Sequence, residues 1–128
     1  MDSLEQRRQT AEGRSTPKAA LSPARNLEKI HRRKRATVRD CVGIATRNKE
    51  IRRMIVFGSS VTDQCGENSD LDICLDIAGG AKKRSVFESV ADMSVLCGGA
   101  CDILIYSRLS EPLKGTIERK GVVVYELP

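Results

Sequence analysis

The chain has 128 residues, 40% of them hydrophobic, which suits one compact domain with a modest core. Its net charge of +5 is concentrated at the front, since residues 1–39 hold 11 of the 22 Lys and Arg but only 4 of the 17 Asp and Glu. No stretch reaches the roughly 20 apolar residues of a membrane span, and no apolar signal core is present. We therefore exclude a membrane protein and expect a soluble, cytoplasmic one.

The five cysteines form an odd set without the dense framework of a small secreted protein, so we expect free thiols in a reducing compartment. The segment containing Cys97 and Cys101 resembles half of a zinc site. No second cysteine pair follows it, and His31 is the only histidine. A structural zinc site is therefore disfavoured.

Residues 1–22 mix polar residues and Pro without apolar periodicity, which predicts a flexible basic tail ahead of a domain over residues 23–128. The domain is expected to begin with a helix over about 24–48, where apolar residues recur at three- and four-residue steps. Its basic middle should interrupt or fray this helix. The apolar run 53–57 then predicts a first strand that ends in a tight turn at Gly58.

The remaining chain alternates between strand and helix patterns. In chain order we expect a polar loop or short helix, a strand, a helix, a strand, a short helix and a terminal strand, over residues 60–69, 70–77, 82–97, 101–106, 109–117 and 122–125. This order predicts an α/β (α+β) fold in which a small mixed sheet of three to four strands is flanked by helices.

Two carboxylates share one face of the strand expected over 70–77. Side chains alternate along a strand, so Asp70 and Asp72 point to the same side, about 7 Å apart along the backbone. Two anions held this close repel each other unless a cation lies between them. Hard oxygen ligands suit Mg²⁺, which commonly keeps waters and nucleotide phosphates as its other ligands. The spacing therefore predicts a magnesium site.

A turn that suits phosphate lies upstream of this strand. Gly58, Ser59 and Ser60 follow a predicted strand and present backbone N–H groups and hydroxyls, although Ser60 is equally well explained as a helix cap. A third carboxylate, Asp102, begins another predicted strand. If that strand lies beside the one that carries Asp72, the three carboxylates are positioned to hold two metal ions.

Read together, these residues match a known pattern. The segment VFGSSVTDQCGENSDLDICLDI, residues 56–77, followed by CDILI at residues 101–105, resembles the minimal nucleotidyltransferases of the polymerase-beta-like superfamily, MNT-type antitoxins among them. The resemblance spans roughly residues 36–126. It implies a polymerase-beta-like nucleotidyltransferase core, with Gly-Ser, Asp-x-Asp and a later lone Asp on successive elements.

The resemblance also implies a role for each matched residue. Gly58 and Ser59 would hold the triphosphate, Asp70 and Asp72 would hold two Mg²⁺ ions, and Asp102 would be the third metal ligand and activate the acceptor. The reaction it implies is in-line attack of an acceptor hydroxyl on the α-phosphorus of a nucleoside triphosphate, with ATP as the expected donor and pyrophosphate leaving. Asp102 would take the hydroxyl proton.

The chain departs from the family pattern at one place. Many members carry an Arg-Gly pair shortly after Gly-Ser, whereas this chain has Thr62 and Asp63. Asp63 would repel a triphosphate if it faced inward, so it either points to solvent or weakens nucleotide binding. We expect Arg52, Arg53 or Lys82 to supply the missing positive charge.

Other polar residues are expected to play lesser parts. Asp76 shares the carboxylate face but lies outside the family motif, so at most it supports the ligands. Ser69 is a turn residue rather than a nucleophile, because a serine nucleophile needs an adjacent base. Tyr106 and Tyr125 are expected to be core or edge residues.

Three functions compete for this chain. The first is transfer of AMP from ATP to a hydroxyl on a partner protein, because small stand-alone members of the family resemble antitoxins that adenylylate a helical toxin ribonuclease. The second is nucleotidyl transfer to a small molecule such as an aminoglycoside, with a dimer completing the pocket. The third is a non-catalytic antitoxin or binding module, including one that uses the basic residues 1–39 on nucleic acid.

Overall fold

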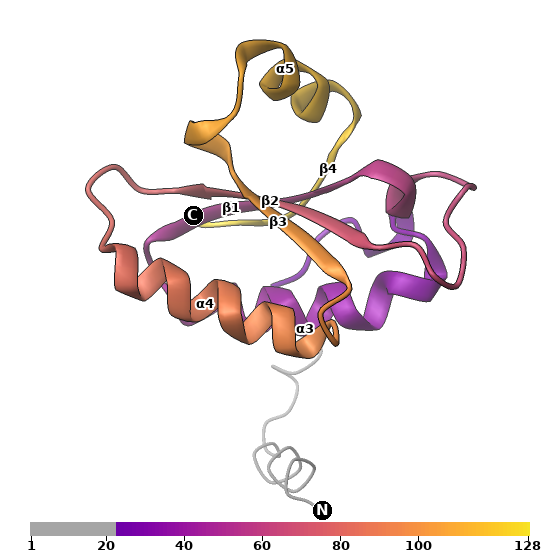
Figure 1. Ribbon diagram of the computed structural model, residues 1–128, viewed down its shortest axis with the longest axis horizontal. Helices are drawn as coiled ribbons and strands as arrows, with labels where there is room; N and C mark the ends of the chain where they lie inside the picture. The colour runs from indigo at the N-terminus through magenta and orange to yellow at the C-terminus, as the bar shows by residue number, and fades with distance from the viewer. Residues whose placement is uncertain (1–22) are drawn as a thin grey trace, which may run out of the picture.

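The computed structural model describes residues 23–128, so the tail predicted over residues 1–22 lies outside the described residues. Three α-helices and four strands make up the described part (Figure 1). In chain order they are α3 (Arg35–Thr46), β1 (Ile51–Phe57), β2 (Leu71–Ile77), α4 (Lys83–Leu96), β3 (Cys101–Ile105), α5 (Glu111–Lys120) and β4 (Val122–Glu126). Among residues 23–128 no helix is long and apolar enough to cross a bilayer.

The four strands form one mixed sheet in the order β3-β2-β1-β4. β1 pairs antiparallel with both β2 and β4, whereas β2 and β3 run parallel. A parallel pair needs a crossover connection, which α4 provides. The predicted fold class, a small mixed sheet flanked by helices, is confirmed.

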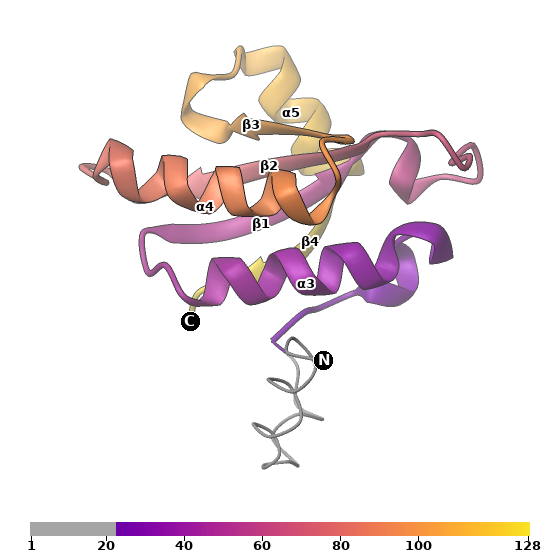
Figure 2. The same ribbon diagram turned by 60° about the horizontal axis from the view of Figure 1, so that its bottom comes forward.

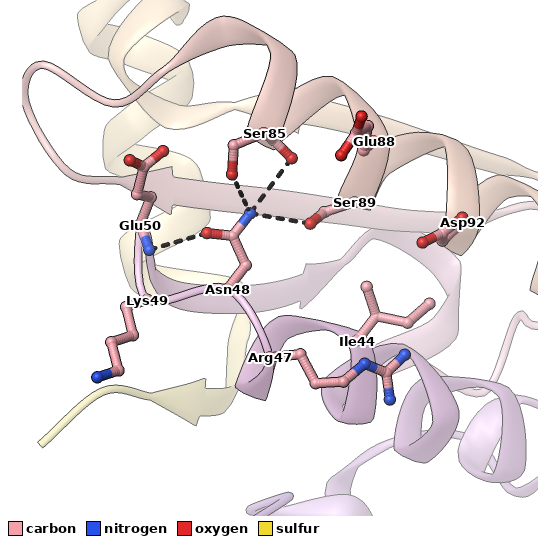
Figure 3. A pocket seen from close by; sticks show the side chains of 9 residues that line it. All are labelled: Ile44, Arg47, Asn48, Lys49, Glu50, Ser85, Glu88, Ser89 and Asp92. Carbon is pink, nitrogen blue, oxygen red and sulfur yellow. Dashed lines mark hydrogen bonds between the residues drawn. The ribbon is translucent and has the colours of Figure 1, made fainter.

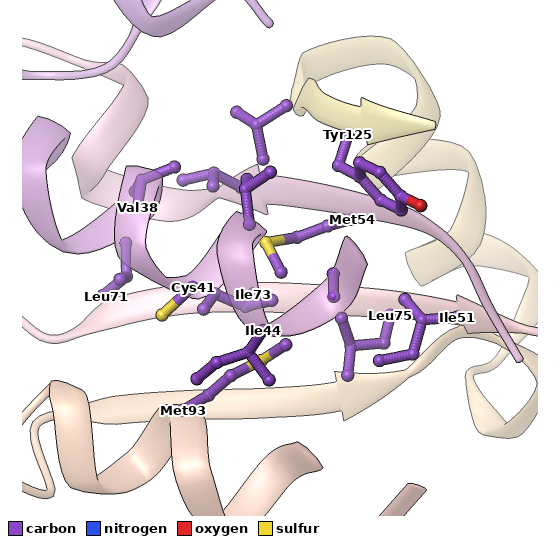
Figure 4. Close-up of a cluster of buried hydrophobic side chains, with 14 of the residues drawn as sticks. Val38, Cys41, Ile44, Ile51, Met54, Leu71, Ile73, Leu75, Met93 and Tyr125 are labelled. Carbon is purple, nitrogen blue, oxygen red and sulfur yellow. The ribbon is translucent and has the colours of Figure 1, made fainter. Parts of the chain in front are cut away.

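The larger hydrophobic core lies between the sheet and the layer formed by α3 and α4 (Figures 1 and 4). α3 turns Val38, Cys41 and Ala45 to the sheet, and Met93 does the same from α4. These residues lie at three- and four-residue steps along α3, as a helix that buries a single face requires. The sheet contributes alternate strand residues, among them Leu71, Ile73 and Leu75.

The opposite face of the sheet is covered by α5 (Figure 2). Ile117 of α5 packs there with Ile55 of β1 and Cys74 of β2. Because side chains alternate along β2, the face that carries Cys74 also carries Asp72. The strands therefore bury one face under α3 and α4, and they present the carboxylates on the face that α5 covers in part.

The first predicted helix is shorter than expected. Only Arg35–Thr46 is α-helical, preceded by two 3₁₀ turns, η1 (Leu27–Lys29) and η2 (Arg32–Lys34). Asn26 has a left-handed backbone with φ of 56°, and its side chain donates to the Val123 carbonyl at 2.8 Å. These contacts with the β4 edge compete with helix formation, so the long helix predicted over 24–48 is wrong at its front.

The remaining elements lie close to the predicted ones. β1 begins at Ile51, two residues before the predicted run, and β3 ends at Ile105 because Tyr106 opens the 3₁₀ turn η4 (Tyr106–Arg108). The polar stretch predicted over 60–69 begins within one further 3₁₀ turn, η3 (Gly58–Val61), and continues as a loop.

Candidate active site

Asp72 and Asp102 lie side by side at one end of the sheet. They are register partners in the parallel pair of β2 and β3, so their Cα atoms are separated by about one strand spacing, roughly 4.8 Å. The adjacency of these two strands, expected from the sequence, is confirmed. Asp70 lies two residues before Asp72, just ahead of the start of β2 at Leu71. Three carboxylates therefore gather at this end.

Gly58 ends β1 beside this group and contacts Asp72 closely. Phe57, the last residue of β1, is the register partner of Asp72. Gly58 has φ of +77°, and an ideal Cβ there would overlap with Oδ2 of Asp72 and lie 3.2 Å from its Cγ. A side chain at this position would thus both strain the backbone and displace the carboxylate. Glycine allows the turn to approach the Asp72 carboxylate.

The electrostatics of Asp72 reflect this crowding. Burial, followed by the charges of Asp102 and Asp70, raises the pKa of the Asp72 carboxyl. Both causes penalise the ionised form, and a cation between the carboxylates would relieve them. Asp70 and Asp102 are therefore both close enough to repel the Asp72 carboxylate.

The serines of the turn differ in their surroundings. Ser60 is fully buried, and its hydroxyl has no hydrogen-bond partner among the described residues. No side chain caps η3, so the alternative of Ser60 as a helix cap is wrong. The carbonyl of Ser59 accepts bonds from the backbone N–H and the hydroxyl of Thr62, at 3.0 and 2.9 Å. These bonds close the turn on itself.

The carboxylates fit Mg²⁺ as a group that a nucleotide completes. Among residues 23–128 no three His, Cys, Asp or Glu side chains converge as a preformed metal site. Mg²⁺ is ordinarily held in such sites by one or two carboxylates, with waters and substrate phosphates as the other ligands. Asp72 with its neighbours Asp70 and Asp102 meets that requirement.

The cations expected to compensate for the missing Arg-Gly pair lie elsewhere. Arg52, Arg53 and Lys82 belong to the opposite end of the sheet, where Ile51 pairs with Ile77. A six-residue run of extended chain spans about 20 Å, so Arg52 is far from Gly58. The expectation that these residues supply phosphate-facing charge is wrong, because Arg52 and Arg53 lie at the start of β1 and Gly58 follows its end, while Lys82 lies beside Glu50 just before β1.

Arg53 is also engaged in a network of its own. Its guanidinium bonds Asp76 at 3.2 Å and Glu118 at 2.9 Å, and it lies 5.3 Å from the centre of the Tyr106 ring. The Tyr106 hydroxyl donates to Glu118 at 2.8 Å. Asp76 therefore joins an ion-pair network that ties β1 and β2 to α5, at the end of the sheet away from Asp72 and Asp102.

A different basic segment lies at the end of the sheet that carries Asp72 and Asp102. The run from His31 to Arg35, predicted as the basic middle of the first helix, packs against the candidate site. The His31 N–H donates to the Ser60 carbonyl at 2.7 Å, and Lys34 Nζ donates to the Ser69 carbonyl at 2.5 Å. In the sequence, the run of five basic residues was the only signal that this segment could act at the site.

Asp63 was expected either to point to solvent or to weaken nucleotide binding. In the structure its side chain is exposed, as the first alternative requires.

A separate hollow of about 330 Å³ lies between α3 and α4, at the end of the domain remote from Asp72 (Figure 3). Asn48 crosses it, donating to the hydroxyls of Ser85 and Ser89 at 2.9 Å each and accepting from the Glu50 N–H at 3.0 Å. These bonds fasten the turn after α3 to α4. The Asn48 side chain that crosses the hollow therefore has a structural role.

The cysteines and tyrosines agree with their expected roles. All five cysteines are free thiols, and burial raises the pKa of Cys41 and of Cys74 to about 11, which keeps both protonated. Tyr125 is buried in the core, whereas Tyr106 lies at the edge beside α5. Ser69 is a turn residue whose hydroxyl accepts from the Gly66 N–H at 2.8 Å.

Several solved structures have a fold similar to that of this chain. A toxin-antitoxin complex with AMP-PNP superposes with a TM-score of 0.57 at 16% identity, over 72% of this chain and 73% of that one. A tri-AMPylated Shewanella oneidensis HEPN toxin in complex with MNT antitoxin gives 0.56 at 14%, over 73% of each chain. A minimal nucleotidyltransferase gives 0.57 at 23%, over 76% of this chain and 94% of that one. None of the curated proteins matches the sequence.

The mixed four-stranded sheet, the glycine turn and the carboxylates all lie within one family match. The family described as Polymerase beta, Nucleotidyltransferase matches residues 39–127. The chain belongs to this family. The match includes Gly58, Asp70, Asp72 and Asp102, and it excludes the basic segment at 31–35.

Proposed function

We propose that this protein is a Mg²⁺-dependent nucleotidyltransferase that moves AMP from ATP to a hydroxyl on a partner protein. The observation that carries the proposal is the register pairing of Asp72 with Asp102 beside the close approach of Gly58. A family of nucleotidyl-transferring enzymes supplies the reaction class. The bound AMP-PNP of a similar structure supports ATP as the donor.

Each residue has a defined task in this proposal. The backbone of Gly58 and Ser59 and the buried hydroxyl of Ser60 would receive the triphosphate. Asp70 and Asp72, with Asp102 beside them, would hold the ions. Bound Mg²⁺ would neutralise the phosphate charge that develops during transfer.

Asp102 is suited to receive the acceptor proton. It is exposed at the start of β3, whereas Asp72 beside it is half-buried. A hydroxyl of the acceptor would lose its proton to Asp102 as its oxygen bonds to the α-phosphorus. The bond from that phosphorus to the bridging oxygen breaks, and pyrophosphate leaves.

The acceptor is proposed to arrive on another chain. Two of the similar structures are toxin-antitoxin complexes, and in one the HEPN toxin is AMPylated and bound to its MNT antitoxin. A helical toxin ribonuclease is accordingly the partner we propose. The exposed position of Asp102 suits a large acceptor, since a macromolecule can reach it directly from solvent.

Label transfer tests this function. The protein, Mg²⁺, α-labelled ATP and the protein encoded by the neighbouring gene are incubated together, with γ-labelled ATP in parallel. We expect α-label to reach the partner and γ-label to stay off it, because the γ-phosphate leaves in pyrophosphate. Asp72→Asn and Asp102→Asn should abolish transfer, while Glu88→Gln, an exposed carboxylate on α4, should not. Absence of transfer with each of the four nucleotides would refute the proposal and leave the two other functions, transfer to a small molecule and a non-catalytic antitoxin.

A further inference from the structure

The basic segment of residues His31–Arg35 spans both halves of the candidate site. It leads into α3 at the same end of the sheet as η3 (Figure 2). The His31 N–H holds the Ser60 carbonyl in the phosphate turn, and Lys34 Nζ holds the Ser69 carbonyl, one residue before Asp70. The segment thus contacts the turn proposed for the triphosphate and the loop that carries a proposed metal ligand.

The site has a charge imbalance that this segment can correct. Asp70, Asp72 and Asp102 are anions, and a triphosphate adds further negative charge. The turn and the two residues after it, Thr62 and Asp63, contain no Lys or Arg, so the turn itself provides no cation and Asp63 adds an anion. Basic side chains from elsewhere in the chain are therefore needed close to the turn.

Within the segment, Lys34 and Arg32 keep free donors and also lie beside the turn or the loop before Asp70. Arg35 is bound to its own neighbours, with Nε on the Ile30 carbonyl at 2.8 Å. Lys34 is half-buried and uses one N–H on Ser69, which leaves two N–H donors. Arg32 is exposed and lines a hollow of about 310 Å³ together with Thr62 and Asp63.

We propose that Lys34 and Arg32 form the cationic wall of the donor site and bind the polyphosphate of a nucleoside triphosphate. The inference rests on the proposed function and adds to it the residues that recognise the phosphates. Lys34 holds the loop before Asp70 and faces the phosphates with its remaining donors. Arg32 adds charge beside Thr62 and offsets Asp63.

Binding of a phosphate series tests the assignment. Calorimetric titration with AMP, ADP and ATP in Mg²⁺ is compared for wild type, Lys34→Gln, Lys34→Arg and Arg32→Gln. The control is Lys49→Gln, which changes an exposed lysine in the turn between α3 and β1, at the end of the domain remote from Asp72. Loss of one charge-assisted bond weakens ATP binding by about tenfold or more. We expect that loss for ATP with Lys34→Gln, a smaller loss for AMP, and partial retention with Lys34→Arg.

The dependence on phosphate number separates binding from a structural role. If Lys34 only supported the fold, Lys34→Gln would weaken AMP, ADP and ATP binding alike, which would overturn the inference. If Lys34→Gln does not fold, the exposed Arg32→Gln carries the test, and an unchanged ratio of ATP to AMP affinity in that variant overturns the inference. Wild type that binds none of the four nucleoside triphosphates would refute the proposed function as well. If wild type binds ATP and both Lys34→Gln and Arg32→Gln bind it equally tightly, this inference alone is refuted.

Discussion

Substitution of Gly58 by alanine is the sharpest test of the site geometry, because the chain supplies a matched control. Gly58 and Gly80 have similar backbones, with φ of +77° and +81°. An added Cβ meets the Asp72 carboxylate at Gly58 and nothing within 4 Å at Gly80. Both alanine variants therefore strain the backbone, and only Gly58→Ala disturbs Asp72.

The expected magnitudes follow from these two effects. A left-handed backbone costs an alanine roughly 1–2 kcal/mol, so both variants should lose about that much free energy of unfolding. In Gly58→Ala the carboxylate must also rotate from its position, at a further cost of about 0.5–1.5 kcal/mol. Because rotation moves Asp72 from its place in the site, ATP binding in Mg²⁺ should fall by about tenfold or more in this variant, whereas Gly80→Ala should bind as wild type does.

Urea unfolding followed by circular dichroism measures the first quantity, and calorimetric titration with ATP in Mg²⁺ measures the second. The reasoning would be refuted if Gly58→Ala matched Gly80→Ala in both stability and nucleotide affinity. Equal affinities would mean that the close approach of Gly58 to Asp72 has no part in nucleotide binding.

Three further predictions follow from the electrostatics and the hydrogen bonds. The pKa of Asp72 is raised, so the wild-type protein loses stability as pH rises through that pKa. Asp72→Asn should therefore melt at a higher temperature than wild type at pH 7, and the difference should shrink in acid. Mg²⁺ should raise the melting temperature of wild type only. Hydrogen bonds from Arg53 and Tyr106 lower the pKa of Glu118. Glu118→Gln should therefore melt at a lower temperature than wild type at pH 7, and it should lack the loss of stability that wild type shows as pH falls through that pKa. Identical melting profiles in acid would contradict this. Asn48→Ala should lower the free energy of unfolding in urea by about 1–3 kcal/mol, because it removes the hydrogen bonds to Ser85 and Ser89. Label transfer per folded molecule should be unchanged. A loss of transfer would assign the hollow between α3 and α4 to the active site.

The local patterns in the sequence predicted much of the fold and the carboxylate face. Alternation along residues 70–77 placed Asp72 with Cys74 on one face and Leu71 with Ile73 on the other, and the structure agrees. This succeeds because a strand with one buried face fixes the direction of every side chain. No local pattern placed Asp102 beside Asp72; that placement came from the family resemblance, and the structure confirms that the two strands are neighbours.

Long-range contacts explain what the sequence could not predict. The helical pattern over 24–48 was correct only from Arg35 onward, because Arg25 and Asn26 bond instead to carbonyls of β4, about a hundred residues away. The same folding back brings the basic residues 31–35 to the candidate site. No local pattern reports a partner so distant in the chain, and a run of positive charge has the same composition whether it is solvated or packed.

The parallel pairing of β2 with β3 also determines when the carboxylates can meet during synthesis. Asp102 is made thirty residues after Asp72, and α4 must form between them before the two strands can align. At translation rates of roughly 5–20 residues per second this is a delay of about 1.5–6 s. A nascent chain that has released β1 and β2 from the ribosome therefore carries the glycine turn and two aspartates without their neighbour. The proposed nucleotidyl transfer needs Asp102, so it should begin only after β3 has emerged and paired with β2 at the edge of the sheet.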